Sequence, residues 1–311
     1  MTRSEFTFPS ADGKTAVHAV EWLPEGPVRA VLQISHGVAE YILRYEPFAE
    51  YLTARGFAVA GHDHVGHGDS VAPGGARLYF GPRGSWNWVV DDLYTRRDLA
   101  GKRFSGAPVF LLGHSMGSFL ARTYLIRYPG TMAGAVIMGT GQMPAAVIAG
   151  GRLVAAVERW KVGEEHTSPV VDKLAFGAYN RIFAPNRTGF DWLSLDEGNV
   201  DRYIADPLCG GNASIGLFRE MLSGLRFIAK PENLKKMNTH TPILFVSGAM
   251  DPVGDCSKGV LRACHSFEKA GCRDVSVKLY PELRHEILNE GCREEIYGDI
   301  YQWLADRLPP C

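Results

Sequence analysis

Short apolar runs alternate with helical patterns along most of this chain, and this alternation limits the possible folds more than any other feature. Seven runs predict strands, most of them apolar throughout, as expected for strands buried on both faces: Ala16–Leu23, Ala30–Ser35, Phe57–Gly61, Val109–Gly113, Gly134–Met138, Ile243–Ser247 and Val275–Tyr280. Helical patterns lie between or after them, at Arg44–Arg55, Trp88–Phe104, Ser115–Tyr128, Lys258–Ala270 and Glu294–Leu308. The order predicts an α/β fold, with a mostly parallel sheet covered by helices on both faces. The first two strands, separated only by a turn around Pro24 and Pro27, are compatible with an antiparallel hairpin.

Residues 141–228 interrupt this alternation. They hold helical and loop patterns without a convincing strand, so we expect a helical cap inserted between two parts of an α/β core, residues 1–140 and 229–311. A length of 311 residues with 46% hydrophobic residues is enough for one large domain that carries such an insertion.

The charge, the N-terminus and the cysteines narrow the class of protein. The formal net charge is −1 and no basic block is present, which argues against nucleic acid as a partner. The N-terminal residues lack the pattern of a signal peptide, and no run of about 18 apolar residues occurs, so a cytoplasmic protein is expected. The six cysteines form no C-x-x-C pair and are expected to be free thiols: Cys209, Cys256, Cys264, Cys272, Cys292 and Cys311.

A serine lies between two glycines where a predicted strand meets a predicted helix, in the stretch Gly113-His114-Ser115-Met116-Gly117. The pattern G-x-S-x-G in this context indicates a nucleophile elbow, a strained turn that exposes a hydroxyl at a helix N-terminus. Glycines are needed there because side chains would collide with the neighbouring elements. We therefore predict that Ser115 is a nucleophile, the alternative being a serine that only caps the helix.

A serine nucleophile needs a base, and the base needs an acid that orients it. In a sheet of this kind the partners follow on loops after later strands, in the order Ser, acid, His. Asp251 lies just past the strand that ends at Ser247 and is the predicted acid, with Asp255 as the alternative. His285 is the one histidine after the last predicted strand and is the predicted base.

The same chemistry requires two backbone N–H groups that bind the developing oxyanion. Met116, directly after the nucleophile, is predicted to supply one. Val38, in the loop Ser35-His36-Gly37-Val38 after an early strand, is predicted to supply the other. Gly37 would let the backbone approach the substrate, and His36 is expected to hold the loop by hydrogen bonds.

The segment from Gly61 to Gly68 carries three histidines and raises a metal site as an alternative. His62 and His64 would share one face of an extended segment, with His67 close by, and zinc sites use such ligands. The competing interpretation is a glycine-rich loop whose polar side chains form hydrogen bonds, and no further ligand set is evident, so no metal is expected. No phosphate-binding or dinucleotide-binding glycine motif occurs, so no cofactor is expected either.

These segments together resemble the α/β-hydrolases of the monoacylglycerol lipase and lysophospholipase group, also classed with serine aminopeptidase-like hydrolases. The resemblance spans most of the chain and rests on HGVAEYILRYEPFAEYLTARGF, GHDHVGHGDS, GHSMGS, NVDRYIADPLC, SGAMDPVG and YPELRHEILNE. It implies the α/β-hydrolase fold, a triad of Ser115, Asp251 and His285, and oxyanion donors at Val38 and Met116. Tyr41 and Val65 depart from the family, which often has His and Arg there; neither is a triad position.

The expected activity is hydrolysis of carboxylic esters of glycerol or lysophospholipid type through an acyl-enzyme on Ser115, with a small acyl ester as substrate. The predicted cap is rich in apolar residues, which suits an acyl chain and would allow transient contact with a membrane surface. The alternatives are a general carboxylesterase or thioesterase of short acyl chains, an amide or peptide hydrolase, or a ligand-binding protein on a hydrolase scaffold. The loop sequence HGVAE differs from the HGGPG loop usual in iminopeptidase-type relatives, which counts against a peptidase.

Overall fold

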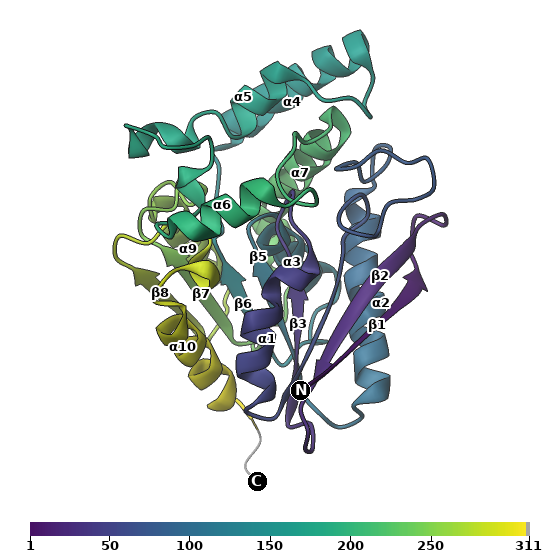
Figure 1. Cartoon of the computed structure of the whole chain (residues 1–311), viewed down its shortest axis with the longest axis vertical. Coiled ribbons are helices and arrows are strands. Elements are labelled where there is room, and N and C mark those ends of the chain that lie inside the picture. The colour runs from purple at the N-terminus through teal and green to yellow at the C-terminus, as the bar shows by residue number, and fades with distance from the viewer. Residues whose placement is uncertain (309–311) are drawn as a thin grey trace.

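The computed structural model describes residues 1–308, and within them eight strands form a single sheet (Figure 1). The order across the sheet is β1-β2-β4-β3-β5-β6-β7-β8. Neighbours from β4 to β8 are parallel, whereas β2 is antiparallel to both β1 and β4. The strands are Thr2–Pro9 (β1), Ala16–Leu23 (β2), Ala30–Ser35 (β3), Phe57–His62 (β4), Val109–His114 (β5), Gly134–Met138 (β6), Ile243–Gly248 (β7) and Val275–Tyr280 (β8). The prediction of a mostly parallel α/β sheet is confirmed.

The structure differs from the sequence-based expectations for the first strands in two ways. The segments Ala16–Leu23 and Ala30–Ser35 do not form a hairpin, because β4 lies between them and pairs with both. The edge strand Thr2–Pro9 was not predicted at all. Its residues are mostly polar and partly exposed, and only Phe8 is fully buried, so it lacks the continuous apolar run of the inner strands.

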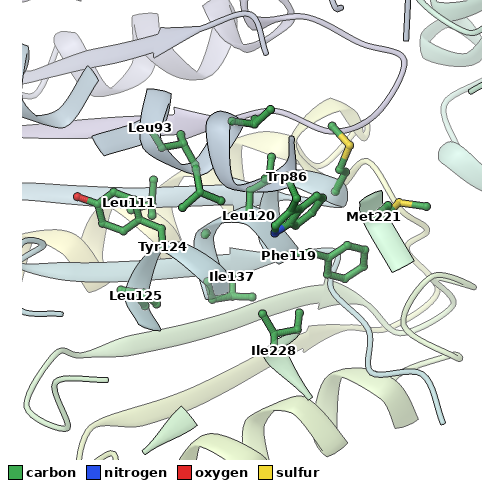
Figure 2. Close-up of a cluster of buried hydrophobic side chains, with 14 of the residues drawn as sticks. Trp86, Leu93, Leu111, Phe119, Leu120, Tyr124, Leu125, Ile137, Met221 and Ile228 are labelled. Atoms are coloured by element: carbon green, nitrogen blue, oxygen red, sulfur yellow. The ribbon is translucent and has the colours of Figure 1, made fainter. Parts of the chain in front are cut away.

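Helices cover both faces of the sheet, as predicted (Figure 1). The helices α1 (Glu46–Thr53) and α10 (Arg293–Ala305) pack on one face, and α2 (Trp86–Arg103), α3 (Met116–Arg127) and α9 (Lys258–Lys269) pack on the other. Figure 2 shows the centre of the second layer, where Trp86 and Leu93 of α2 meet Leu120 and Tyr124 of α3 above the sheet. This packing holds α3, and therefore the turn at its N-terminus, firmly against β5.

The segment between β6 and β7 is helical and lies over the carboxyl edge of the parallel strands (Figure 1). It contains α4 (Ala145–Val162), α5 (Pro169–Ala175), α6 (Glu197–Ala205) and α7 (Ile215–Ile228), followed by α8 (Pro231–Leu234); the 3-10 turns η2 (Tyr179–Phe183) and η3 (Asp191–Leu193) lie between α5 and α6. We call residues 141–228 the α4–α7 segment. Its helix α7 packs against both α3 and α4, which joins the segment to the layer shown in Figure 2.

Two further expectations concern thiols and membrane spans. Cys209, Cys256, Cys264, Cys272 and Cys292 are free, as predicted, whereas Cys311 lies outside the described residues. Within residues 1–308, none of the helices is both long enough and apolar enough to cross a bilayer.

Candidate active site

Ser115 occupies the sharp turn between β5 and α3. Its backbone has φ 53° and ψ −122°, a conformation that a residue with a side chain adopts at a cost of about 1–3 kcal/mol. The backbone N–H of Ser115 donates to the carbonyl oxygen of Met138 at 3.0 Å, which anchors the strained turn to the neighbouring strand β6. The turn therefore has the geometry that the G-x-S-x-G pattern predicted.

The two glycines of the pattern are required by close backbone contacts. A Cβ atom on Gly117 would overlap the carbonyl oxygen of Ser35 at the end of β3. A Cβ atom on Gly113 would overlap the carbonyl oxygen of Gly117 and the side chain of Ala121. Helix α3 can begin this close to the sheet only because both positions lack a side chain.

The predicted acid and base lie together at the carboxyl edge of the sheet. Nδ1 of His285, in the loop after β8, is 2.9 Å from Oδ2 of Asp251, which follows β7. Both residues are buried, and Asp251 also accepts a hydrogen bond from the backbone N–H of Val253 at 2.9 Å. The alternative acid, Asp255, instead pairs with the exposed Arg262 at 3.0 Å. The structure thus brings Asp251, and not Asp255, to the histidine.

Ser115 and His285 line the same cavity, which has a volume of about 340 Å³. Within the described residues no hydrogen bond joins their side chains, a separation that is common before substrate is bound. The ring of His285 packs between two aromatic rings, with centroids 4.7 Å from His114 and 5.1 Å from Trp192. These contacts fix the plane of the imidazole next to the cavity.

The two predicted oxyanion donors flank the serine. Val38 and Met116 line a cavity together with Ser115, and no hydrogen bond within residues 1–308 uses the backbone N–H of either. The loop that carries Val38 lies against the nucleophile, since a Cβ atom on Gly37 would come within 3.1 Å of Ser115 Cβ. His36 supports the loop as expected: its Nδ1 is 2.7 Å from the carbonyl oxygen of Gly37, and its Nε2 accepts from the backbone N–H of His64 at 2.9 Å.

The histidines considered as metal ligands form a buried cluster next to this loop, with their rings edge to face. The rings of His62 and His64 have centroids 5.1 Å apart, and those of His64 and His67 are 6.4 Å apart. In the part of the chain that the structure describes, the one group of potential ligand atoms within 4.8 Å of one another is His18, Asp63 and Asp69. Within this group His18 Nδ1 and Asp63 Oδ2 form a 2.9 Å hydrogen bond.

A buried network of charged side chains, which sequence reasoning missed, surrounds the site. Arg44 donates to Glu40 at 2.9 Å and to both carboxylate oxygens of Glu286 at 2.7 and 2.8 Å. His114 Nδ1 is 3.0 Å from Glu40. The sequence did hold a signal, because Glu40, His114 and Glu286 each lie within two positions of a predicted site residue.

The charge states in this network follow from burial and pairing. Burial disfavours the charged form of Glu40, but the hydrogen bond and charge of His114 and the charge of Arg44 hold the pKa of Glu40 below its usual range. Burial alone would lower the pKa of His114, yet the hydrogen bond and charge of Glu40 raise that pKa. The pair therefore favours a carboxylate beside an imidazolium.

Two cavities meet at the nucleophile, and the larger one has more polar groups in its lining. The cavity of about 340 Å³ includes polar groups from Glu40, Asn212 and His285. A second cavity, of about 180 Å³, is lined mostly by apolar residues, many of them from α3, α4, α5 and α7; the lining residues whose side chains carry a hydroxyl or N–H group are Ser115, Tyr179 and Trp192. Val38, Ser115, Phe176 and Trp192 line both cavities. A bound molecule with one polar and one apolar part could therefore extend to both sides of Ser115.

Comparison with known proteins gives consistent matches over nearly the whole chain. Residues 26–291 match the family model described as serine aminopeptidase, S33. The chain is 30% identical over 308 residues to a monoacylglycerol lipase of Mycolicibacterium smegmatis, with 99% of each covered. It is 29% identical over 290 residues to the monoglyceride lipase of Homo sapiens, covering 92% of this chain and 86% of that one. A thermostable carboxyl esterase from Bacillus coagulans, solved in complex with glycerol, superposes with a TM-score of 0.92 at 27% identity, over 99% of this chain and 100% of that chain.

Proposed function

We propose that this chain, which belongs to the serine aminopeptidase (S33) family, hydrolyses monoacylglycerols at Ser115, with His285 as the base and Asp251 as the acid. The family resemblance expected from the sequence is confirmed, and the chain is a carboxylic ester hydrolase. The observation that best supports the residue assignment is the 2.9 Å contact between His285 Nδ1 and Asp251 Oδ2, beside the cavity that Ser115 lines.

The first half of the proposed reaction forms an acyl-enzyme. His285 removes the proton from Ser115 Oγ as that oxygen attacks the ester carbonyl. Asp251 accepts the Nδ1–H of His285, which leaves Nε2 as the base and stabilises the imidazolium that forms. The N–H groups of Val38 and Met116 bind the oxyanion, each contributing about 3 kcal/mol in a site of good geometry.

The second half releases both products. The His285 imidazolium protonates the departing glycerol oxygen, and the alcohol leaves the acyl-enzyme. Water then enters, loses a proton to neutral His285 and attacks the acyl carbonyl, and collapse of the second tetrahedral intermediate frees the fatty acid and regenerates Ser115.

The two cavities support a monoacylglycerol as the substrate. The apolar cavity of about 180 Å³ would hold the acyl chain, because burial of an alkyl chain against apolar side chains removes its surface from water. The more polar cavity of about 340 Å³ would hold the glycerol, whose hydroxyls need hydrogen-bond partners such as Asn212. The relatives named as monoacylglycerol or monoglyceride lipases support the same substrate.

We also propose that the α4–α7 segment acts as a cap on a core made of residues 1–140 and 229–311. Residues of α4, α5 and α7 form the walls of the apolar cavity, so this segment would determine which acyl chains enter. The outer side of α4 exposes Leu153 and Trp160, at 68% and 86%, and this exposure supports transient contact with a membrane surface.

Filling the apolar cavity should change the preferred acyl length. Val147 of α4 lines this cavity but is 56% exposed, so the larger side chain in Val147→Trp can be accommodated without unfolding. We expect kcat/KM for lauroyl glycerol to fall by about tenfold or more, because an excluded part of the chain loses its burial, while hydrolysis of butyryl glycerol changes little. Steady-state kinetics across a series of monoacylglycerols measures this.

The matched control is Leu153→Trp, on the same helix but outside the cavity lining. It should leave the ratio of lauroyl to butyryl turnover unchanged. An equal loss of both activities in Val147→Trp, or wild-type protein that prefers acetyl esters to longer ones, would favour a general carboxylesterase and contradict the proposed acyl site.

A further inference from the structure

We infer that Glu40 is the positioning residue of the oxyanion hole, which it holds in place from behind by binding the backbone of Gly37 on one side and the ring of His114 on the other. The inference rests on the proposed function, since it concerns how the predicted donors are held. Glu40 is buried, at 4% exposure, and does not belong to the predicted triad.

The first contact fixes the loop that carries Val38. The backbone N–H of Gly37 donates to Oε1 of Glu40 at 2.6 Å, which closes the four-residue loop on itself. Gly37 also packs on the nucleophile, because a Cβ atom there would lie 3.1 Å from Ser115 Cβ. Any shift of the Glu40 carboxylate would therefore move the N–H of Val38 relative to Ser115.

The second contact reaches the catalytic histidine through His114. Nδ1 of His114 lies 3.0 Å from Oε1 of Glu40, and Nε2 lies 3.3 Å from the backbone carbonyl oxygen of His285. The Tyr45 hydroxyl also lies 3.0 Å from Nδ1 of His114, but it donates to Glu40 Oε1, which leaves Nδ1 free to donate to the same carboxylate. With Nε2 facing a carbonyl oxygen and Glu40 raising the pKa of His114 against burial, the imidazolium is favoured. Loss of the negative charge at Glu40 would leave this cation without its partner, directly beneath the base.

Other contacts hold Glu40 in a single orientation. Its Oε1 also accepts from the hydroxyl of Tyr45 at 3.0 Å, and its Oε2 accepts from Arg44 at 2.9 Å. The far side of the loop is held by the α4–α7 segment, because the carbonyl oxygen of Ala39 accepts from the Tyr203 hydroxyl at 3.1 Å and from the Gly210 N–H at 2.9 Å. The loop thus lies between two sets of hydrogen bonds, and Glu40 is the centre of the inner set.

The variant Glu40→Gln tests this role by removing the charge at nearly constant size. Because the oxyanion exists only during the reaction, we expect kcat to fall by about 10- to 100-fold while KM stays within about threefold. Affinity for a trifluoromethyl ketone with a long alkyl chain, which forms an oxyanion adduct with a serine, should fall by the same factor as kcat. A purely structural role would not couple these two measurements.

Glu21→Gln is the matched control, since Glu21 is also buried and pairs with Arg96 at 2.8 Å, but lies on β2 outside both cavities. It should lower the melting temperature and leave kcat unchanged. If Glu40→Gln does not fold, Tyr45→Phe replaces it as the test, because it removes one hydrogen-bond donor to Glu40 and keeps the carboxylate charge. We expect kcat to fall by about threefold in this variant, at similar KM.

The outcomes separate this inference from the proposed function. Wild-type protein without ester turnover, or with turnover that survives Ser115→Ala, overturns the proposed function and this inference together. Ser115-dependent turnover whose kcat changes by less than about twofold in folded Glu40→Gln, or in Tyr45→Phe when the first variant does not fold, overturns this inference alone. This inference alone is also overturned if the whole loss in kcat/KM comes from a rise in KM.

Discussion

Ser115→Ala is expected to lower the turnover of monoacylglycerols and of p-nitrophenyl esters by about 10⁴-fold or more, because no other group can form the acyl-enzyme. The oxyanion donors and the cavities remain in this variant, so a small residual rate over water is the most that it should retain. The strained φ of 53° at this position is retained with alanine, so folding should be little affected. Release of fatty acid, followed over time, measures the loss.

A fluorophosphonate probe gives an independent readout of the same serine. The wild-type protein should react with one probe per chain, and Ser115→Ala should not react at all, because the probe requires an activated hydroxyl. The control is Ser223→Ala, whose hydroxyl lies on α7 and donates to the carbonyl oxygen of Arg219. It should keep both labelling and turnover. A wild-type protein that binds monoacylglycerol but neither reacts with the probe nor releases fatty acid would instead be a binding protein.

Acid should destabilise the fold strongly between pH 7.5 and pH 5, because of the buried histidines behind the oxyanion loop. Burial lowers the pKa of His62 and the pKa of His67 to about 3 each, and lowers the pKa of His64 well below its usual value. These groups stay neutral in the fold but gain protons in the unfolded chain, where the pKa is about 6.5. Their stabilising contribution is therefore complete above pH 6.5 and is lost as the pH falls below that value.

The pKa values in the unfolded chain set the size of this loss in unfolding free energy, as long as the pKa values of the three histidines in the folded protein stay below 5. Each of the three histidines then lowers the free energy of unfolding at pH 5 by about 2 kcal/mol, or by about 6 kcal/mol together. Two buried histidines of the site act in opposite directions, since Glu40 raises the pKa of His114 and burial lowers the pKa of His36. Two further groups oppose the loss of stability: hydrogen bonding to Asp63 raises the pKa of His18 to about 9, and burial raises the pKa of Asp92 to about 6. After allowance for the partial exposure of His18, His18 and Asp92 together stabilise the fold by about 2 kcal/mol over this pH range. The net loss in the free energy of unfolding is therefore roughly 3–4 kcal/mol.

Urea unfolding at the two pH values measures this loss, and His62→Phe identifies its source. Neither ring nitrogen of His62 has a hydrogen-bond partner within the described residues, so phenylalanine removes the titration without breaking a bond. We expect the free energy of unfolding to drop by about 2 kcal/mol less in this variant than in the wild type over the same pH range. The exposed His265, which pairs with Glu268, supplies a control, and its replacement by Phe should leave the acid sensitivity of the free energy of unfolding at the wild-type level. Equal acid sensitivity in all three proteins would show that these histidines are not the cause.

Several features of the fold could be predicted because they depend on local sequence. The inner strands and the core helices were found from apolar runs and helical spacing, since those patterns follow directly from burial on two faces or on one. The pairing of strands could not be found in this way. Ala16–Leu23 and Ala30–Ser35 are neighbours in sequence and are separated in the sheet by β4, because the choice of partner depends on how α1 crosses between β3 and β4.

The candidate site likewise has some residues that local sequence could predict and others that only the fold brings together. Ser115, Asp251 and His285 could be proposed from strand ends and their order along the chain, and the glycines around Ser115 from the turn they permit. Glu40 and Arg44 could not, because an isolated Glu or Arg is usually exposed to solvent, and only the fold buries this pair beside Glu286.

The amino-acid sequence by itself determined the α/β class, the elbow and the order of the proposed triad, because each depends on residues close together in the chain or on the regular succession of strands. The tertiary structure alone decided that Asp251 rather than Asp255 meets His285, that four charged side chains support the oxyanion loop from behind, and that two unlike cavities meet at Ser115. These are contacts between segments distant in sequence. Their energies depend on burial and on distances of a few ångströms, which no local pattern encodes.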